Sequence, residues 1–167
     1  MNSVPGASKI LVGLQGEDSF WLKLDGDVRV PWCVSLESYC EAVIKQIGIK
    51  SVYVDLVGAT NLDSTTLGVL AKVAVYTQQY CHQQAVLFCA NEDIERLIIS
   101  MGFSAVFDIQ EGFGDIRLNF KDLPILDCTE AEVKEVVIAA HKALMELTED
   151  NRACFGGLVE SLEQTRS

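Results

Sequence analysis

The sequence predicts an α/β fold, in which a mainly parallel or mixed central sheet is flanked by helices and is followed by a C-terminal helical extension. Two observations support this prediction. Short apolar segments rich in β-branched residues alternate with segments whose apolar residues recur at helical spacing, as in sheets with helical crossovers. Residues 129–167 instead contain two successive segments of helical spacing. With 167 residues, 49% of them hydrophobic, the chain is long enough for one domain with a buried core plus an appendage.

The predicted domain begins with two strands, over residues 8–16 and 19–26, which are joined by the turn-prone sequence QGED. Residues 34–48 have apolar residues at helical spacing and end on a glycine, which predicts a helix. Residues 51–59 are short and rich in β-branched side chains, so we expect a strand that is buried on both faces.

The second half of the domain continues the alternation. Residues 65–80 form one apolar helical face, and residues 84–90 are a compact apolar strand. Residues 91–103 begin with asparagine and acidic residues and carry a glycine near their end, which predicts a helix. Residues 105–109 are a last short strand. The order β-β-α-β-α-β-α-β predicts a mainly parallel sheet in a domain over residues 1–111.

The C-terminal part is predicted to be a connector over residues 112–128 and a helix pair over residues 129–167. The connector contains glycine and proline and shows no sustained period. A capping box begins at Thr129, and a second helix is expected from Thr148 to about Glu163. The first of these helices has an apolar stripe that consists of Val133, Val137, Ala140 and Leu144. A single helix of this length is only marginally stable without packing, so we expect the stripe to bury against the domain or against a second copy of the chain.

The formal net charge of −11 excludes some classes of partner. Such a surface repels phosphate backbones and anionic lipid headgroups, so we expect no nucleic-acid and no membrane partner. No apolar stretch has the length of a membrane span, and the N-terminus lacks the basic and apolar regions of a secretory signal peptide. Six cysteines without a C-x-x-C pair predict a reduced, cytoplasmic protein with buried free thiols.

Motifs for catalysis and for cofactors are missing from the sequence, which has no phosphate-binding glycine loop and no G-x-S-x-G elbow. The two histidines, His82 and His141, are expected to be surface residues because neither has a partner at metal-ligand spacing. A Ser-His-Asp site built on Ser64 from distant positions is not excluded by spacing, but it is disfavoured. Asp25 and Asp27 are interpreted as a turn at a strand end rather than as metal ligands. We therefore expect no enzyme, no cofactor and no metal site.

Three hydroxyls and a carboxylate, Asp63-Ser64-Thr65-Thr66, interrupt an otherwise apolar stretch. One interpretation is a helix N-cap at Ser64, with Asp63 adding favourable charge to the helix end. The other is a phosphorylation switch, because a helix N-terminus tolerates an anion and a phosphate would add about −1.5 to −2 charge at the edge of a docking surface. The residues alone do not decide between these interpretations, which are compatible.

The segment VYVDLVGATNLDSTTLGVLAKV resembles the central motif of STAS domains, the anti-sigma factor antagonists. Asp55 and Leu56 match the end of the family's strand, and the loop and helix start are matched by Leu62, Asp63, Ser64, Thr65, Leu67 and Gly68. Together with NEDIERLIISMGFSAVFDI, the resemblance covers residues 8–111. It implies that Ser64 is the phosphoacceptor, and we expect Ser64 and the exposed start of its helix to form the docking edge for an anti-sigma factor. It also implies partner-binding residues, namely Asp63, Ser64, Thr65, Thr66 and Gly68.

Two residues depart from the family pattern, since Thr66 replaces a usual glycine and Arg29 a usual aspartate. The tail, however, is similar to that of HsbA-type anti-anti-sigma factors, whose motif DSTTLGLLAKL also carries threonine at the Thr66 position. This resemblance implies an anti-sigma factor of flagellar type as partner, a serine kinase and a PP2C-type phosphatase response regulator. It also implies roles in motility and biofilm formation.

Two alternatives stay open: a scaffold that does not use phosphorylation, and a STAS domain that binds a small molecule in an apolar pocket between the tail and the sheet. A homodimer is also left open.

Overall fold

A computed structural model describes residues 7–112 and 118–165. The parts of the predicted domain, connector and tail that fall on residues 1–6, 113–117 and 166–167 lie outside the described residues.

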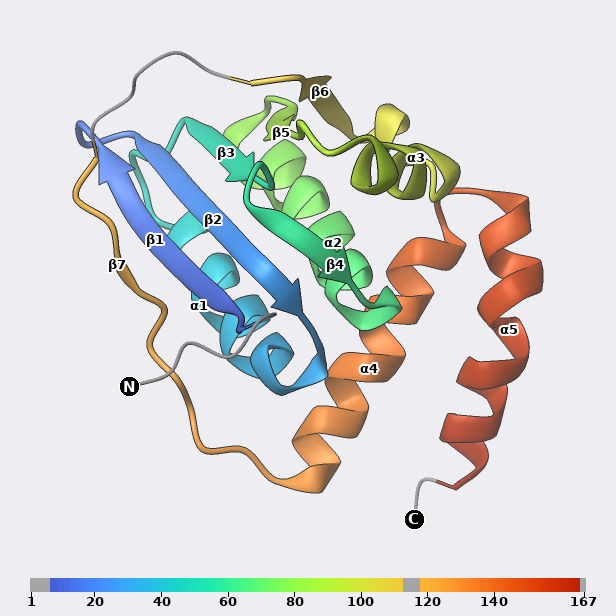
Figure 1. The fold of residues 1–167 in the computed structure, drawn as a ribbon. Coiled ribbons are helices and arrows are strands. Elements are labelled where there is room, and N and C mark those ends of the chain that lie inside the picture. Colours follow the sequence, from blue (N-terminus) through green and yellow to red (C-terminus); the bar gives the residue numbers. More distant parts are fainter. Residues whose placement is uncertain (1–6, 113–117, 166–167) are drawn as a thin grey trace.

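The centre of the fold is a mixed sheet with the strand order β6-β5-β3-β2-β1-β7, in which β4 pairs separately with β2 (Figure 1). The strands of the described part are β1 (Lys9–Gln15), β2 (Ser19–Val28), β3 (Ser51–Asp55), β4 (Ala59–Leu62), β5 (Ala85–Phe88), β6 (Phe107–Gln110) and β7 (Lys121–Asp122). β2, β3, β5 and β6 run parallel, while β1 is antiparallel to both its neighbours. The prediction of a mainly parallel, mixed sheet is confirmed.

The helices are α1 (Cys33–Ile44), α2 (Ser64–Cys81), α3 (Glu92–Ser100), α4 (Glu130–Met145) and α5 (Glu149–Gln164), with short 3-10 turns η1 (Val30–Trp32) and η2 (Phe103–Ala105). All of these helices except α3 form two further layers, whereas α3 contacts β4 and η2. α1 and α2 lie on one face of the sheet, behind it in Figure 1. α4 packs on α2 and, less extensively, on α1, and α5 packs on α4. The first layer beyond the sheet is therefore α1 with α2, and the C-terminal helices lie outside it.

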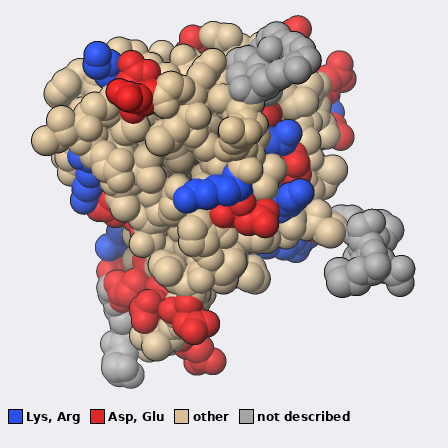
Figure 2. Space-filling model, turned by 90° about the vertical axis from the view of Figure 1, so that its left-hand side faces the viewer, with Lys and Arg blue, Asp and Glu red and all other residues tan. Residues whose placement is uncertain are grey.

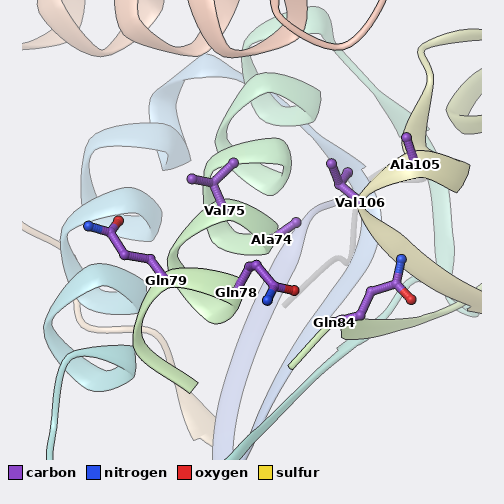
Figure 3. A pocket seen from close by; sticks show the side chains of 7 residues that line it. All are labelled: Ala74, Val75, Gln78, Gln79, Gln84, Ala105 and Val106. Carbon is purple, nitrogen blue, oxygen red and sulfur yellow. The ribbon is translucent and has the colours of Figure 1, made fainter. Parts of the chain in front are cut away.

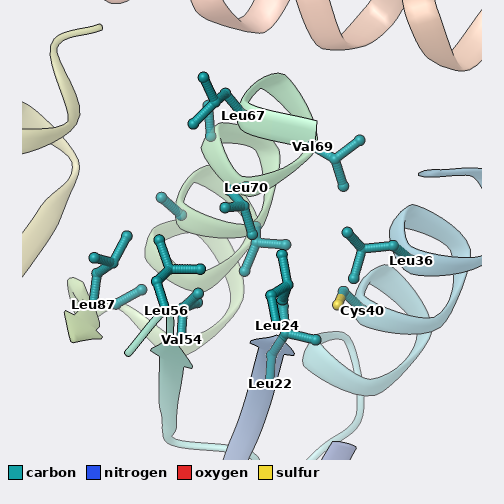
Figure 4. Close-up of a cluster of buried hydrophobic side chains, with 14 of the residues drawn as sticks. Leu22, Leu24, Leu36, Cys40, Val54, Leu56, Leu67, Val69, Leu70 and Leu87 are labelled. Atoms are coloured by element: carbon teal, nitrogen blue, oxygen red, sulfur yellow. The ribbon is translucent and has the colours of Figure 1, made fainter. Parts of the chain in front are cut away.

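The core lies between the sheet and the α1–α2 layer (Figure 4). Successive side chains of a strand point to opposite faces, so Phe20, Leu22 and Leu24 of β2 all enter this layer, and all are buried. Leu36 and Cys40 of α1 approach from one side, and the apolar face of α2 closes the other. This packing fixes α2 against the sheet and so places the helix start at Ser64.

Two strands were not predicted. The predicted strand over residues 51–59 breaks after Asp55, because the Asp55 carboxylate accepts a hydrogen bond from the Val57 N–H (2.9 Å) and turns the chain. β4 then pairs with the end of β2. β7 lies in the predicted connector and pairs with two residues of β1, a contact too short to leave a period in the sequence.

The C-terminal helices form as predicted and pack on their own chain. Thr129 and Thr148 cap them through hydrogen bonds from Glu132 N–H and Asn151 N–H. In the predicted stripe, Ala140 and Leu144 are fully buried, whereas Val133 and Val137 are half-buried. Asn151 ties the pair to the rest of the fold, since its side-chain amide donates to the carbonyls of Met101 and Leu144.

The cysteines are free thiols, as predicted, but only some are buried. Cys33, Cys40 and Cys89 lie in the core, Cys81 is half-buried, and Cys128 and Cys154 are exposed, which corrects the expectation for the last two. On the face shown in Figure 2, acidic side chains gather toward the lower end, and basic side chains higher up lie next to acidic ones.

Candidate functional site

Asp63, and not Ser64, is the N-cap of α2, which corrects one of the two interpretations of this motif. Its Oδ1 accepts a hydrogen bond from Thr66 N–H (2.8 Å), and its Oδ2 accepts one from Val30 N–H (2.8 Å). One carboxylate thus caps the helix and ties its start to the segment that follows β2. Because Asp63 does the capping, the hydroxyl of Ser64 at the first helical position is left for other contacts.

The Ser64 hydroxyl contacts His141 of α4, with 2.8 Å between Oγ and Nε2. The other ring nitrogen, Nδ1, lies 2.7 Å from the carbonyl oxygen of Val137. A carbonyl can only accept, so Nδ1 carries the proton, and in the neutral ring Nε2 accepts the hydrogen bond that Ser64 donates. His141 is only 2% exposed and makes an edge contact with Phe155 (5.1 Å between ring centroids). The expectation of a surface histidine is wrong for His141, whereas His82 is exposed.

Gly68 lies one turn after Ser64, at a position where α2 and α4 approach each other closely. A Cβ atom at Gly68 would lie 2.2 Å from the carbonyl oxygen of Ala140, a distance that no real side chain keeps. The glycine therefore lets the two backbones touch. Since residues four apart share a helix face, the face that carries Ser64 and Gly68 is the one that α4 covers.

The start of α2 is less accessible than the sequence suggested. Thr65, Thr66 and Gly68 are buried, and Ser64 is half-buried. The expectation of an exposed helix start is therefore wrong for the three buried residues. Asp63 and Ser64 keep part of their surface in solvent.

Thr66, which departs from the family pattern, has polar contacts around its buried hydroxyl. Its Oγ1 lies 2.7 Å from Asp63 Oδ1 and 3.1 Å from the carbonyl oxygen of Val28. Cys33 Sγ is 3.4 Å away on the third side, and burial raises the pKa of this thiol to about 12, so that it stays neutral. A threonine here therefore holds the capping carboxylate of Asp63 in place.

Arg29, the second departure, pairs with Asp27, whose two oxygens each lie 2.9 Å from its Nε. Asp25 and Asp27 do not form a turn, because β2 continues through Gly26 with a register shift at a positive φ of 76°. Within residues 7–112 and 118–165, no three His, Cys, Asp or Glu side chains gather as they would around a metal ion.

Ser64 and His141 have the geometry of a nucleophile with its base, so the disfavoured serine–histidine pairing is present in part. The third member of a triad is replaced by the Val137 carbonyl, and α4 lies over the hydroxyl. The arrangement is thus suited to holding a serine in place. His141 and Ala140 were not predicted as site residues, because they contact residues of α2 that lie more than 70 positions earlier in the chain. The signal that could have pointed to them is the pair of small residues that precede His141 on a capped helix.

Comparisons with known proteins identify the fold of the chain. No family model matches the chain, and no curated protein matches its sequence. Among solved structures, it is similar to an anti-sigma factor antagonist from Mycobacterium paratuberculosis, with a TM-score of 0.56 and 18% sequence identity. The similarity covers 92% of that chain and 66% of this one.

The chain has the STAS fold.

Because almost the whole of the M. paratuberculosis protein is matched, the STAS fold is present in full, and about one third of this chain has no counterpart there. In the part of the chain that the structure describes, no helix is both long and apolar enough to cross a membrane.

The Ser64–His141 contact can be measured by a double-mutant cycle. His141→Phe keeps a ring against Phe155 but removes the acceptor for Ser64, so we expect a loss of about 1 kcal/mol in the free energy of unfolding, the usual net value of a hydrogen bond. In a Ser64→Ala background the same replacement should cost about 1 kcal/mol less. Urea unfolding of the four proteins measures the coupling, and a coupling of zero would show that the two side chains do not interact.

Proposed function

We propose that this protein is an anti-sigma factor antagonist whose docking is controlled by phosphorylation of Ser64. The observation that carries the proposal is the position of Ser64, half-buried at the first residue of α2 with a hydroxyl not used for capping. The shared STAS fold and the description of the M. paratuberculosis neighbour support the role.

The local chemistry supports a switch at this residue. The N-terminus of α2 presents backbone N–H groups and the positive end of the helix dipole, which can accommodate a phosphate. The same phosphate would bring about −1.5 to −2 charge next to the Asp63 carboxylate and replace the proton that Ser64 shares with His141. A regulatory coupling of this kind is typically worth about 1–3 kcal/mol, or about 5–150-fold in affinity.

The proposed cycle is a partner switch and involves no catalysis by this chain. The unphosphorylated form sequesters an anti-sigma factor, a serine kinase phosphorylates Ser64 and releases it, and a PP2C-type phosphatase restores binding. By its resemblance in the motif and the tail, the chain would be of the HsbA type, with a flagellar anti-sigma factor as partner and effects on motility and biofilm formation. The docking surface would include Asp63, Ser64, Thr65, Thr66 and Gly68.

Substitution of Ser64 tests this proposal. Ser64→Ala should bind the anti-sigma factor in the presence of active kinase, and Ser64→Asp should bind it at least five-fold more weakly than Ser64→Ala. Ser161→Asp is the matched control, because it adds the same charge at an exposed position of α5 and should leave binding unchanged. A phosphosite map of intact protein with Thr65 or Thr66 as the sole phosphorylated residue would contradict the assignment.

A second candidate is binding of a small apolar molecule. The observation that favours it is a pocket of about 390 Å³, within the range of ligand sites, between the C-terminal half of α2 and η2 (Figure 3). Its lining is apolar with a rim of glutamines: Ala74, Val75, Gln78, Gln79, Gln84, Ala105 and Val106. The sequence analysis placed such a pocket between the C-terminal tail and the sheet. In the structure the tail helix α4 packs on α2, and the pocket lies at α2 and η2 instead. A co-purified ligand in native mass spectrometry that is lost in Ala74→Trp would support this function.

A further inference from the structure

The face of α2 that carries Ser64 and Gly68 already has a helix seated on it. α4 crosses this face with its backbone in contact at Gly68 and with His141 on the Ser64 hydroxyl. The tight contact requires a small residue on each helix, glycine on α2 and alanine on α4. The shape of this face therefore selects a helix that carries a small residue at the crossing point.

The contact between α4 and α2 is tight at one end only. Beyond the crossing, a furrow of about 280 Å³ runs between the two helices. It is lined by Lys72, Val75 and Tyr76 of α2, by Ala139, Lys142 and Ala143 of α4, and by Glu146, the C-cap of α4. Val75 remains 46% exposed there, although it continues the same face of α2. α4 thus occupies the part of the face nearest Ser64 and leaves apolar surface beside it for a longer contact.

We propose that the Ser64–Gly68 face of α2 is a helix-binding groove which α4 occupies within the chain, and that a helix of the partner protein must displace α4 to dock. The identity of that partner as an anti-sigma factor rests on the proposed function above; the groove and its cover do not. The partner helix carries alanine or glycine at the crossing point, apolar residues toward Val75, and a neutral hydrogen-bonding group opposite Ser64. Binding and covering are then mutually exclusive, so that α4 sets the affinity of the site.

Accessibility of position 64 tests the cover. Ser64→Cys, in a full chain whose Cys81, Cys128 and Cys154 are replaced by serine, provides a thiol for maleimide labelling. Ala140→Leu places bulk against Gly68 from the α4 side and leaves α2 unchanged, so we expect labelling to become at least ten-fold faster. Ala131→Leu, the same replacement at an exposed position of α4, should leave the rate unchanged.

A second variant guards against misfolding. Leu144→Ala removes buried volume from the same side of α4 without adding any and should accelerate labelling by a smaller factor. Far-UV circular dichroism and the melting transition show whether each variant is folded. Folded Ala140→Leu and Leu144→Ala proteins that label at the parent rate would overturn the proposal.

Occupancy by a second helix is tested with a synthetic peptide of residues 129–165, labelled with a fluorophore and carrying serine at position 154. It should bind the full-chain Ala140→Leu protein at least ten-fold more tightly than the wild type, whose groove is filled. The same peptide with Ala140→Leu should lose that binding. Equal binding to both proteins, or none to the opened variant, would overturn the proposal. Neither assay uses a kinase or an anti-sigma factor, so each can fail or succeed independently of the role of Ser64 phosphorylation.

Discussion

Replacing Gly68 with alanine will detach α4 from α2. In an isolated helix this change is favourable by about 0.5–1 kcal/mol, because alanine restricts the unfolded chain. Here the added Cβ would lie 2.2 Å from the Ala140 carbonyl oxygen and 2.6 Å from its Cβ, so that α4 must move away. We expect a net loss of about 1–3 kcal/mol in the free energy of unfolding, the usual cost of overpacking, together with faster amide exchange in α4.

Gly157 provides the matched control for this prediction. It lies within α5, and a Cβ at this position would meet nothing within 4 Å. Gly157→Ala should therefore stabilise the protein by up to about 1 kcal/mol. Urea unfolding and hydrogen exchange of both variants measure the difference. If Gly68→Ala were also stabilising, the close approach of the two helices would not exist in solution.

Asp63→Ala should be the most destabilising single change at the site. It removes the cap of α2, which costs about 0.5–2 kcal/mol, and it leaves the Val30 N–H without its acceptor, which costs about 1–3 kcal/mol more. We expect a total loss of about 1.5–5 kcal/mol, the sum of the two contributions, measured by chemical denaturation at constant pH.

Asn91 separates these two contributions. Its side chain caps α3 through the N–H groups of Asp93 and Ile94, so that both of its bonds stay within the helix start. Asn91→Ala should cost only about 1 kcal/mol, the value for a cap alone. An Asp63→Ala loss no larger than that for Asn91→Ala would mean that the link from Asp63 to Val30 contributes nothing.

Local patterns were enough to predict the main elements, because each depends on residues close in sequence. The apolar runs of β2 and β5, the capped start of α3 and the capping box of α4 all lie where the sequence placed them, to within a few residues. β4 and β7 were missed since each consists of four residues or fewer and is held by a partner strand far away in the chain. A two-residue pairing leaves no period to detect.

The candidate site was predictable only in its local half. Asp63 and Ser64 could be recognised from their place between a strand and a helix, although the N-cap was predicted at Ser64 and is Asp63. The contribution of α4 could not be recognised in this way. A histidine within an amphipathic helix has the same local pattern whether it faces solvent or a serine, and only the seating of Ala140 on Gly68 decides which.

The separation of 77 residues between Ser64 and His141 gives the protein a period during synthesis in which the serine is uncovered. At about 5–20 residues per second, the ribosome needs roughly 4–15 s to extend the chain from Ser64 to His141. α2 and the strands β1 to β6 are complete in sequence before then. A nascent chain therefore presents Ser64 before α4 can cover it, and a modification made in that interval would meet α4 as it arrives.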